Sequence, residues 1–270
     1  MRRRTDRDVA CPAQDLHPAR LLGICGTKIL GRRIVLFDSV ESTNAAAMAA
    51  VVAGAAEGTL FIAERQTLGK GRKGRSWFSA EGKSLTFSLI LRPPRKEEAL
   101  TAILALAVVR ALWNFVGRST VKWPNDVFLN GRKLAGILAE SREGAVVVGL
   151  GLNVNETPAD FPSAIAGEAT SMRIAAKKTF DRARVLCRIL EMFEALYEEF
   201  QRGGFAPLRK DVEDRLLYIG ERVSIESGGN VFKGNMIGIT DEGYLRLEAG
   251  GTERVFSSGD LTLVGKTRRR

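Results

Sequence analysis

Leu68-Gly69-Lys70-Gly71-Arg72-Lys73-Gly74-Arg75-Ser76-Trp77 is the stretch around which this sequence is organised. Its glycines allow positive φ angles and let a ligand approach the main chain closely. Its lysines and arginines supply donors for carboxylate and phosphate oxygens, and Trp77 adds a flat apolar surface on which a ring can stack. The stretch therefore favours a loop that binds a ligand carrying both phosphate and a ring. A solvated basic turn is the alternative that this stretch alone leaves open.

The segments on either side of the loop show strand and helix patterns in turn. Before the loop we expect a strand at 34–37, a helix at 45–52 and a strand at 59–64. Asn130-Gly131 is typical of a two-residue hairpin turn. After the loop we expect strands at 84–91, 119–123, 127–129, 133–140 and 145–152, and helices at 97–115 and 179–201.

The last part of the chain has a different pattern. Closely spaced turn motifs, such as Ser227-Gly228-Gly229-Asn230 and Ser258-Gly259-Asp260, separate short strand-like runs. This spacing predicts a small β-barrel or sandwich. We therefore divide the chain into a basic N-terminal segment (1–30), a large domain (31–215), a small β domain (216–265) and a basic tail (266–270).

The net charge of +10 invites a nucleic-acid interpretation, but much of it lies at the ends of the chain. Without the six arginines at positions 2–4 and 268–270, the charge falls to +4. Basic tails bind polyanions without sequence preference, and residues 1–30 are too few for a helix-turn-helix domain. We expect no sequence-specific DNA binding.

The cysteines and the single histidine exclude several kinds of site. Cys11, Cys25 and Cys187 are scattered and lack metal-ligand spacing, which predicts free thiols in a reducing, cytoplasmic setting. His17 lies in an irregular N-terminal segment and is a poor candidate for a catalytic base. No apolar stretch reaches the ~18 residues of a membrane span, so we expect no membrane association.

Two further motifs have residues suited to binding an anion. Lys122-Trp123-Pro124-Asn125-Asp126 places a lysine at a strand end before a turn, although an ordinary strand-to-turn junction explains the same residues. Ser42-Thr43-Asn44 either caps a helix or presents hydroxyls and backbone N–H groups to a ligand. The sequence contains no serine-histidine triad, zinc cluster or Walker-type loop.

Five motifs, taken in order, resemble those of biotin protein ligases, also called biotin–acetyl-CoA-carboxylase ligases. The resemblance runs from about residue 30 to 264, and Gly243-Tyr244-Leu245 and Ser258-Gly259-Asp260 resemble the family's SH3-like domain. The five are Glu41-Ser42-Thr43-Asn44, Gln66 to Trp77, Lys122 to Asp126, Lys133-Leu134-Ala135-Gly136-Ile137-Leu138, and Gly149 to Asn155.

The resemblance implies both a fold and a two-step reaction. The fold is α/β (α+β): a central mixed sheet flanked by helices, similar to class II aminoacyl-tRNA synthetases, with a small C-terminal SH3-like β-barrel. In the reaction, ATP with Mg²⁺ adenylates the biotin carboxylate, and a lysine of a biotin carboxyl carrier protein then attacks the adenylate. ATP is the co-substrate, Mg²⁺ the activator and biotin the substrate, and we expect no tightly bound prosthetic group.

By matching motifs, the resemblance also implies site residues. Lys122 and Arg72 would be catalytic, and metal ligands are not assigned. Biotin would be bound by Ser42, Thr43, Asn44, Gln66, Gly69, Lys70, Gly71, Arg72, Lys122 and Gly136. ATP and the adenylate would be bound by Arg72, Arg75, Trp77, Lys122, Asn125, Lys133 and Asn153.

The sequence departs from the family in two respects. Lys70 stands where members usually have arginine, so a point charge replaces a forked donor. The helix-turn-helix of bifunctional members is missing, which indicates the ligase-only type. The rival interpretations are a lipoate ligase or octanoyltransferase of the same fold, and a nucleic-acid-binding protein.

The carrier protein and the oligomeric state depend on how the sheet ends. We expect the carrier, an acetyl-CoA carboxylase subunit or domain, to dock by strand pairing on an exposed sheet edge. The candidate edges are residues 133–140 and 145–153. Relatives often self-associate through this sheet, so it is also a candidate surface for a homodimer, and the sequence leaves the oligomeric state open.

Overall fold

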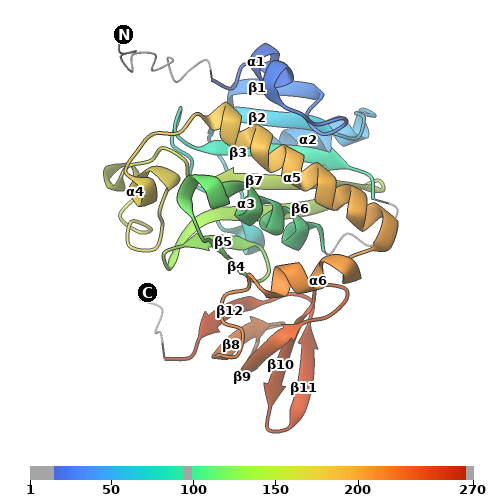
Figure 1. Cartoon of the computed structure of the whole chain (residues 1–270), viewed down its shortest axis with the longest axis vertical. Helices are drawn as coiled ribbons and strands as arrows, with labels where there is room; N and C mark the ends of the chain where they lie inside the picture. Colours follow the sequence, from blue (N-terminus) through green and yellow to red (C-terminus); the bar gives the residue numbers. More distant parts are fainter. Residues whose placement is uncertain (1–14, 94–98, 266–270) are drawn as a thin grey trace, which may run out of the picture.

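A computed structural model describes residues 15–93 and 99–265. Cys11, both arginine clusters and the predicted start of the helix at 97 lie outside the described residues. The large domain contains a seven-stranded mixed sheet whose strand order is β1-β2-β3-β7-β6-β5-β4 (Figure 1). Its strands are β1 (Arg33–Val40), β2 (Thr59–Gln66), β3 (Leu85–Leu91), β4 (Thr120–Lys122), β5 (Asp126–Leu129), β6 (Arg132–Arg142) and β7 (Ala145–Leu152).

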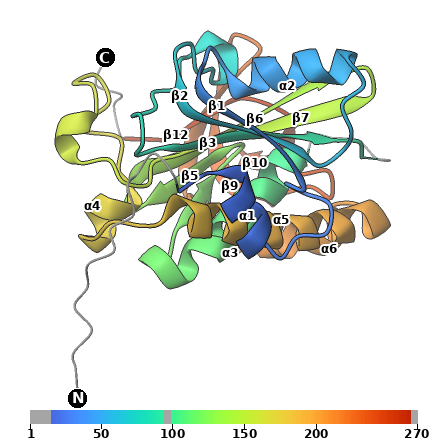
Figure 2. The same cartoon turned by 90° about the horizontal axis from the view of Figure 1, so that it is seen from above.

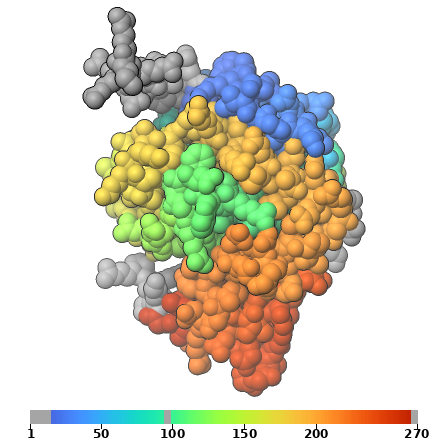
Figure 3. All heavy atoms as spheres, in the orientation of Figure 1, coloured from blue at the N-terminus to red at the C-terminus, as the bar shows by residue number. Residues whose placement is uncertain are grey.

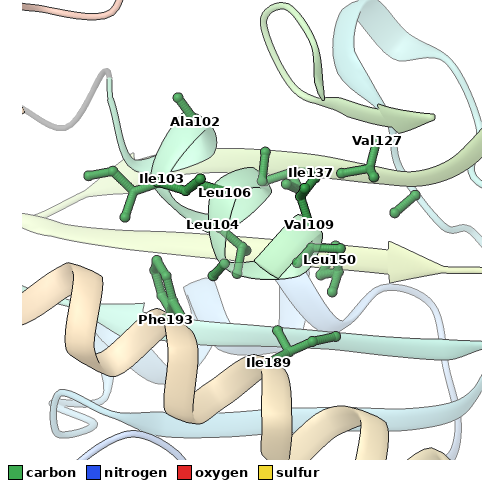
Figure 4. Packing of buried hydrophobic residues seen from close by; sticks show 14 of the residues in the cluster. Ala102, Ile103, Leu104, Leu106, Val109, Val127, Ile137, Leu150, Ile189 and Phe193 are labelled. Atoms are coloured by element: carbon green, nitrogen blue, oxygen red, sulfur yellow. The ribbon is translucent and has the colours of Figure 1, made fainter. Parts of the chain in front are cut away.

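Helices cover both faces of this sheet (Figure 2). The alanine-rich helix α2 (Thr43–Val52) lies on one face, while α3 (Leu100–Val116) and α5 (Arg182–Gly203) lie on the other. All residues of β3 and β7 are buried, because these central strands pack against helices on both faces. The main core gathers around α3 and α5, where Leu104, Ile189 and Phe193 meet the sheet (Figure 4).

The predicted hairpin forms, and it determines which strand lies at an open edge. Asn130 and Gly131 have φ angles of 51° and 76°, as its two-residue turn requires. Strand β5 pairs with β6 only as far as Gly136, and within residues 15–93 and 99–265 no other strand pairs with the outer side of β6 beyond that point. Asn125 adds two hydrogen bonds to Ile137 there. Our second candidate edge, 145–153, was wrong because β7 pairs with β3 on one side and β6 on the other.

The C-terminal domain forms a separate antiparallel sheet below β4 and β5 (Figures 1 and 3). Helix α6 (Ala206–Glu213) precedes it, and Trp123 Nε1 donates to Gly243 O at 3.1 Å, which links the two domains. The strand order is β11-β10-β9-β8-β12. The strands are β8 (Arg222–Ser227), β9 (Asn230–Ile239), β10 (Leu245–Ala249), β11 (Thr252–Phe256) and β12 (Asp260–Leu263).

The sequence patterns missed three short helices: α1 (Pro18–Ile24), α4 (Met172–Ala176) and α6. The segment that we expected to be irregular contains α1, and His17 Nδ1 accepts from Ala19 N at its start. None of these helices is long enough to give a clear periodic signal.

The prediction of free thiols was wrong for two of the three cysteines. Cys25 and Cys187 form a disulfide that joins the end of α1 to α5. The two residues are 162 positions apart, and only the packing of the N-terminal segment against α5 brings them together. Glu194 reinforces this packing by accepting from the backbone N–H groups of Lys28, Ile29 and Leu30.

A buried ion cluster ties the same helix to β2. Arg182, the first residue of α5, is fully buried and donates to the carboxylates of Asp15 and Glu64. Burial alone would lower the pKa of this guanidinium, but the two carboxylates outweigh it and raise the pKa. Removing either carboxylate would leave a buried charge short of partners, so the cluster fixes the end of β2 that leads to Gln66.

Candidate active site

One cavity, with an open volume of about 900 Å³, collects nearly all of the predicted site residues. The glycine-rich loop, the start of α2, the ends of β2 and β4, and strands β6 and β7 line the cavity, together with Gly259, Asp260 and Leu261 of the C-terminal domain. From the predicted set it contains Ser42, Thr43, Asn44, Gln66, Lys70, Gly71, Arg72, Arg75, Trp77, Lys122, Asn125, Lys133 and Gly136.

The glycine-rich loop is folded back on itself. Gly71 N donates to Arg75 O at 2.6 Å, and Trp77 N donates to Gly69 O at 2.8 Å. A Cβ atom on Gly69 would lie 2.5 Å from Trp77 O, so glycine is required there for the two limbs to meet. Arg72, Arg75 and Trp77 of this folded loop line the cavity.

Trp77 lies across two glycines of neighbouring strands. Gly136 of β6 and Gly151 of β7 are register partners, and a Cβ on Gly151 would lie only 2.2 Å from the Trp77 indole. Lys133 Nζ lies 5.6 Å from the centre of the same ring. Trp77 Nε1 is buried and has no hydrogen-bond partner among the described residues.

The C-terminal domain supplies the anion that holds the loop cations. Asp260 accepts from Arg75 at 2.7 Å and from Lys73 at 3.3 Å. Burial opposes ionisation of Asp260, but these two cations outweigh it and hold its pKa below the usual range. Arg72 donates to Gly259 O and to Asn125 Oδ1, and burial lowers the pKa of its guanidinium. An arginine remains protonated at neutral pH even so.

Uncharged hydrogen-bonding groups from the start of α2 and the end of β2 also line the cavity. Ser42 caps α2 through Ala45 N, as one of the two interpretations of this motif predicts. The backbone N and the hydroxyl of Thr43 both donate to Gln66 Oε1, at 2.8 and 3.1 Å. These contacts place a hydroxyl and an amide side by side in the cavity wall.

Lys122 lines the same cavity at the last position of β4, and its Nζ is 5.4 Å from the centre of the Phe128 ring. Asp126 forms an ion pair with Lys133 at 2.8 Å in the same wall. The cavity wall therefore combines uncharged hydrogen-bonding groups with the loop cations and Lys122. Cations in such a wall offset the repulsion between two bound anions and the charge that develops during reaction.

Two predicted residues do not line the cavity. Gly69 only shapes the loop, through its close contact with Trp77 O. The Asn153 side chain is used within the fold: its Nδ2 donates to Thr170 O, and its backbone N donates to Leu134 O. Sequence reasoning in turn missed several lining residues. Asp126 and Asp260 belong to motifs that we had recognised, and alternate glycines in Gly149-Leu150-Gly151 could have indicated side chains packed against β7.

Comparison with known proteins indicates the same family that the sequence motifs resemble. A model of the biotin/lipoate A/B protein ligase family matches residues 36–155, and a model of the biotin protein ligase C-terminal domain matches residues 218–263. The bifunctional ligase/repressor BirA of Bacillus subtilis (strain 168) is 38% identical over 242 residues, covering 86% of this chain and 74% of that protein.

A second relative matches over nearly its whole length. The biotin–[acetyl-CoA-carboxylase] ligase of Mycobacterium tuberculosis is 34% identical over 267 residues, covering 95% of this chain and 98% of that protein. Among solved structures, the biotin protein ligase of Aquifex aeolicus in complex with biotin and ATP superposes with a TM-score of 0.78 at 29% identity. That superposition covers 86% of this chain and 98% of the other.

Proposed function

Because the chain belongs to the biotin protein ligase family, we propose that it biotinylates a carrier protein in two steps. Biotin and ATP form biotinyl-5'-AMP, and biotin then passes to one lysine of a biotin carboxyl carrier protein. The observation that carries the proposal is the cavity, whose wall combines uncharged hydrogen-bonding groups with a cationic loop and Lys122. A bound biotin and ATP in the Aquifex aeolicus relative support the pair of substrates.

In the first step, a biotin carboxylate oxygen attacks the α-phosphorus of ATP and pyrophosphate leaves. We assign the neutral head group to the end formed by Thr43 and Gln66, whose groups are hydrogen-bonding and uncharged. Lys122 then lies at the reacting carboxylate, and Arg72 and Arg75 bind phosphate oxygens. Trp77 supports the adenylate, and the loop keeps water away from the anhydride.

In this proposal Mg²⁺ binds together with ATP. The described residues contain no group of three or more side chains that could hold a metal ion. Mg²⁺ bound to ATP needs only one or two protein carboxylates, because phosphates and water supply the other ligands. Asp126 and Asp260 are carboxylates in the cavity wall, and each is already paired with cations.

In the second step, the carrier lysine attacks the acyl carbon, AMP leaves and the amine loses a proton. His17 caps α1 and does not line the cavity, so it is not the base. The acyl group is already activated, and positioning of the amine supplies much of the acceleration. The outer side of β6 beyond Gly136, where no described strand pairs with it, is where we propose that the carrier docks by strand pairing.

The same edge is also our proposed site for a homodimer, in which case self-association and carrier docking compete. We propose a cytoplasmic location from the need for ATP, because the Cys25–Cys187 disulfide removes the argument from free thiols. No helix among the described residues is long and apolar enough to cross a membrane. We expect no sequence-specific DNA binding from this chain.

The deciding experiment incubates the purified protein with Mg-ATP and either biotin or lipoate, followed by mass spectrometry. We expect biotinyl-5'-AMP and a biotinylated carrier with biotin, and neither product with lipoate. Formation of lipoyl-AMP instead would move the protein to the rival branch of the family. The match to the biotin protein ligase C-terminal domain favours biotin.

A further inference from the structure

A chain of hydrogen bonds behind the head-group end begins at a carboxylate that none of the assignments above uses. We propose that Glu140 is a positioning residue that sets the direction of this chain and thereby keeps the Thr43 hydroxyl ready to accept a hydrogen bond from the bound substrate. The chain runs from Glu140 through Asn44 and Ser88 to Thr43. It therefore connects β6 with β3 and the start of α2.

Two acceptors fix the orientation of the Asn44 amide. Asn44 Nδ2 lies 2.8 Å from Glu140 Oε2 and 3.4 Å from Leu138 O, and both of those oxygens accept only. The amide nitrogen must therefore face β6, and Asn44 Oδ1 must face Ser88. Gly149 makes this packing possible, because a Cβ there would lie 2.1 Å from Asn44 Oδ1.

The orientation of Asn44 then determines which atom accepts the single hydroxyl proton of Ser88. Ser88 Oγ lies 2.6 Å from Asn44 Oδ1, which can only accept, so the Ser88 hydroxyl donates to it. Ser88 is fully buried, so water does not offer its proton another acceptor. With its proton used, Ser88 can act toward Thr43 only as an acceptor.

Thr43 is therefore a donor toward the protein and an acceptor toward the cavity. Ser88 Oγ lies within donating distance of both Asn44 Oδ1, at 2.6 Å, and Thr43 Oγ1, at 2.8 Å, but its one proton serves only one of them. With that proton on Asn44 Oδ1, Ser88 does not donate to Thr43 Oγ1, and the Thr43 proton goes to Gln66 Oε1 at 3.1 Å or to Ser88 Oγ. The oxygen consequently keeps its lone pairs for an N–H group of the ligand, while the amide nitrogen of Gln66 is left to donate.

This inference rests on the proposed function, because the ureido ring of biotin carries the N–H groups that such an acceptor would bind. Replacing Glu140 by lysine puts a donor where Asn44 now finds an acceptor. The Asn44 amide would turn over, its nitrogen would donate to Ser88, and the Ser88 proton would pass to Thr43. One lone pair of the Thr43 oxygen would then be occupied before biotin arrives.

The test is a series at one position: Glu140→Gln, Glu140→Ala and Glu140→Lys. Glutamine keeps a hydrogen-bond acceptor for Asn44 without the charge. Alanine leaves Leu138 O as the acceptor for Asn44, and lysine reverses the direction of the hydrogen bonds from Asn44 to Thr43. Glu143→Lys is the matched control, because it makes the same charge change at an exposed turn residue that follows β6. Biotin-dependent pyrophosphate release gives the KM values for biotin and for ATP, and thermal melting checks folding.

We expect the KM for biotin to rise about tenfold or more in Glu140→Lys and a few-fold in Glu140→Ala. Glu140→Gln and Glu143→Lys should stay near wild type, and the KM for ATP should change little throughout. A biotin analogue methylated on the ureido nitrogen lacks the donor, so its KM should respond less than that of biotin. If Glu140→Lys fails to fold, the Ala and Gln variants still decide.

The inference is overturned by an unchanged biotin KM across the series, or by a Glu140→Gln variant as impaired as Glu140→Ala. An analogue that responds as strongly as biotin would also contradict it, because the effect would then not act through the acceptor. Inactivity of the wild-type protein with biotin would instead refute the proposed function. The two failures are therefore distinguishable.

Discussion

Gly151→Ala tests whether the packing of the Trp77 indole against Gly151 controls nucleotide binding. The added Cβ would lie 2.2 Å from Trp77 Cε2 and 2.3 Å from Nε1, whereas an ordinary contact is at least 3.4 Å. Gly151 lies in a strand that pairs on both sides, so the indole rather than the backbone must retreat, by about 1.2 Å. A misplacement of ~1 Å in a positioned group costs up to ~100-fold in rate.

We therefore expect kcat/KM for ATP to fall about 10- to 100-fold in Gly151→Ala, while the Kd for biotin alone changes little. Pyrophosphate release measures the first quantity and isothermal titration the second. Overpacking of this kind also lowers stability by about 1–3 kcal/mol, which thermal melting would register. Gly167→Ala is the control, because a Cβ there meets nothing within 4 Å. Unchanged ATP kinetics in Gly151→Ala would show that Trp77 does not position the nucleotide.

Four further predictions follow from the site and the fold. Lys122→Ala should lower the rate of pyrophosphate release about 10²–10³-fold without lowering the Tm, and an unchanged rate would remove Lys122 from the chemistry. Arg72→Gly should weaken retention of biotinyl-5'-AMP more than its synthesis, so bystander lysines become biotinylated; clean carrier labelling would contradict this. Burial raises the pKa of Glu156 to about 7, so the folded state binds the extra proton and this residue's contribution to stability falls as pH rises from about 4.5 to 7. Glu156→Gln should accordingly gain roughly 3 kcal/mol relative to wild type at pH 8 and nothing at pH 4, as measured by urea unfolding, and a pH-independent difference would refute the assignment. Reducing the Cys25–Cys187 disulfide, which spans 162 residues, should cost about 2–5 kcal/mol, seen as a lower Tm with reductant, whereas an equal Tm would indicate free thiols.

Local patterns in the sequence were enough to locate most strands and the long helices. Apolar runs identified β3 and β7, and Asn130-Gly131 identified the β5–β6 hairpin, because these signals depend on neighbours in the chain. The motif order also identified the loop and Lys122, which the structure brings into one cavity. The short helices were missed because one or two turns show no usable period.

Only the tertiary structure decided which residues far apart in the chain are in contact. Asp260 reaches Arg75 across 185 positions, Cys25 meets Cys187, and Glu140 reaches Asn44 across 96 positions. None of these pairs has a local signal, because each depends on how strands and helices pack after they form. The same reason explains why β7 could be mistaken for an edge: a strand's residues specify its extended shape, whereas its neighbours depend on the whole sheet. The sequence by itself thus determined the local elements and the chemical groups of the site, and packing determined which groups face one another.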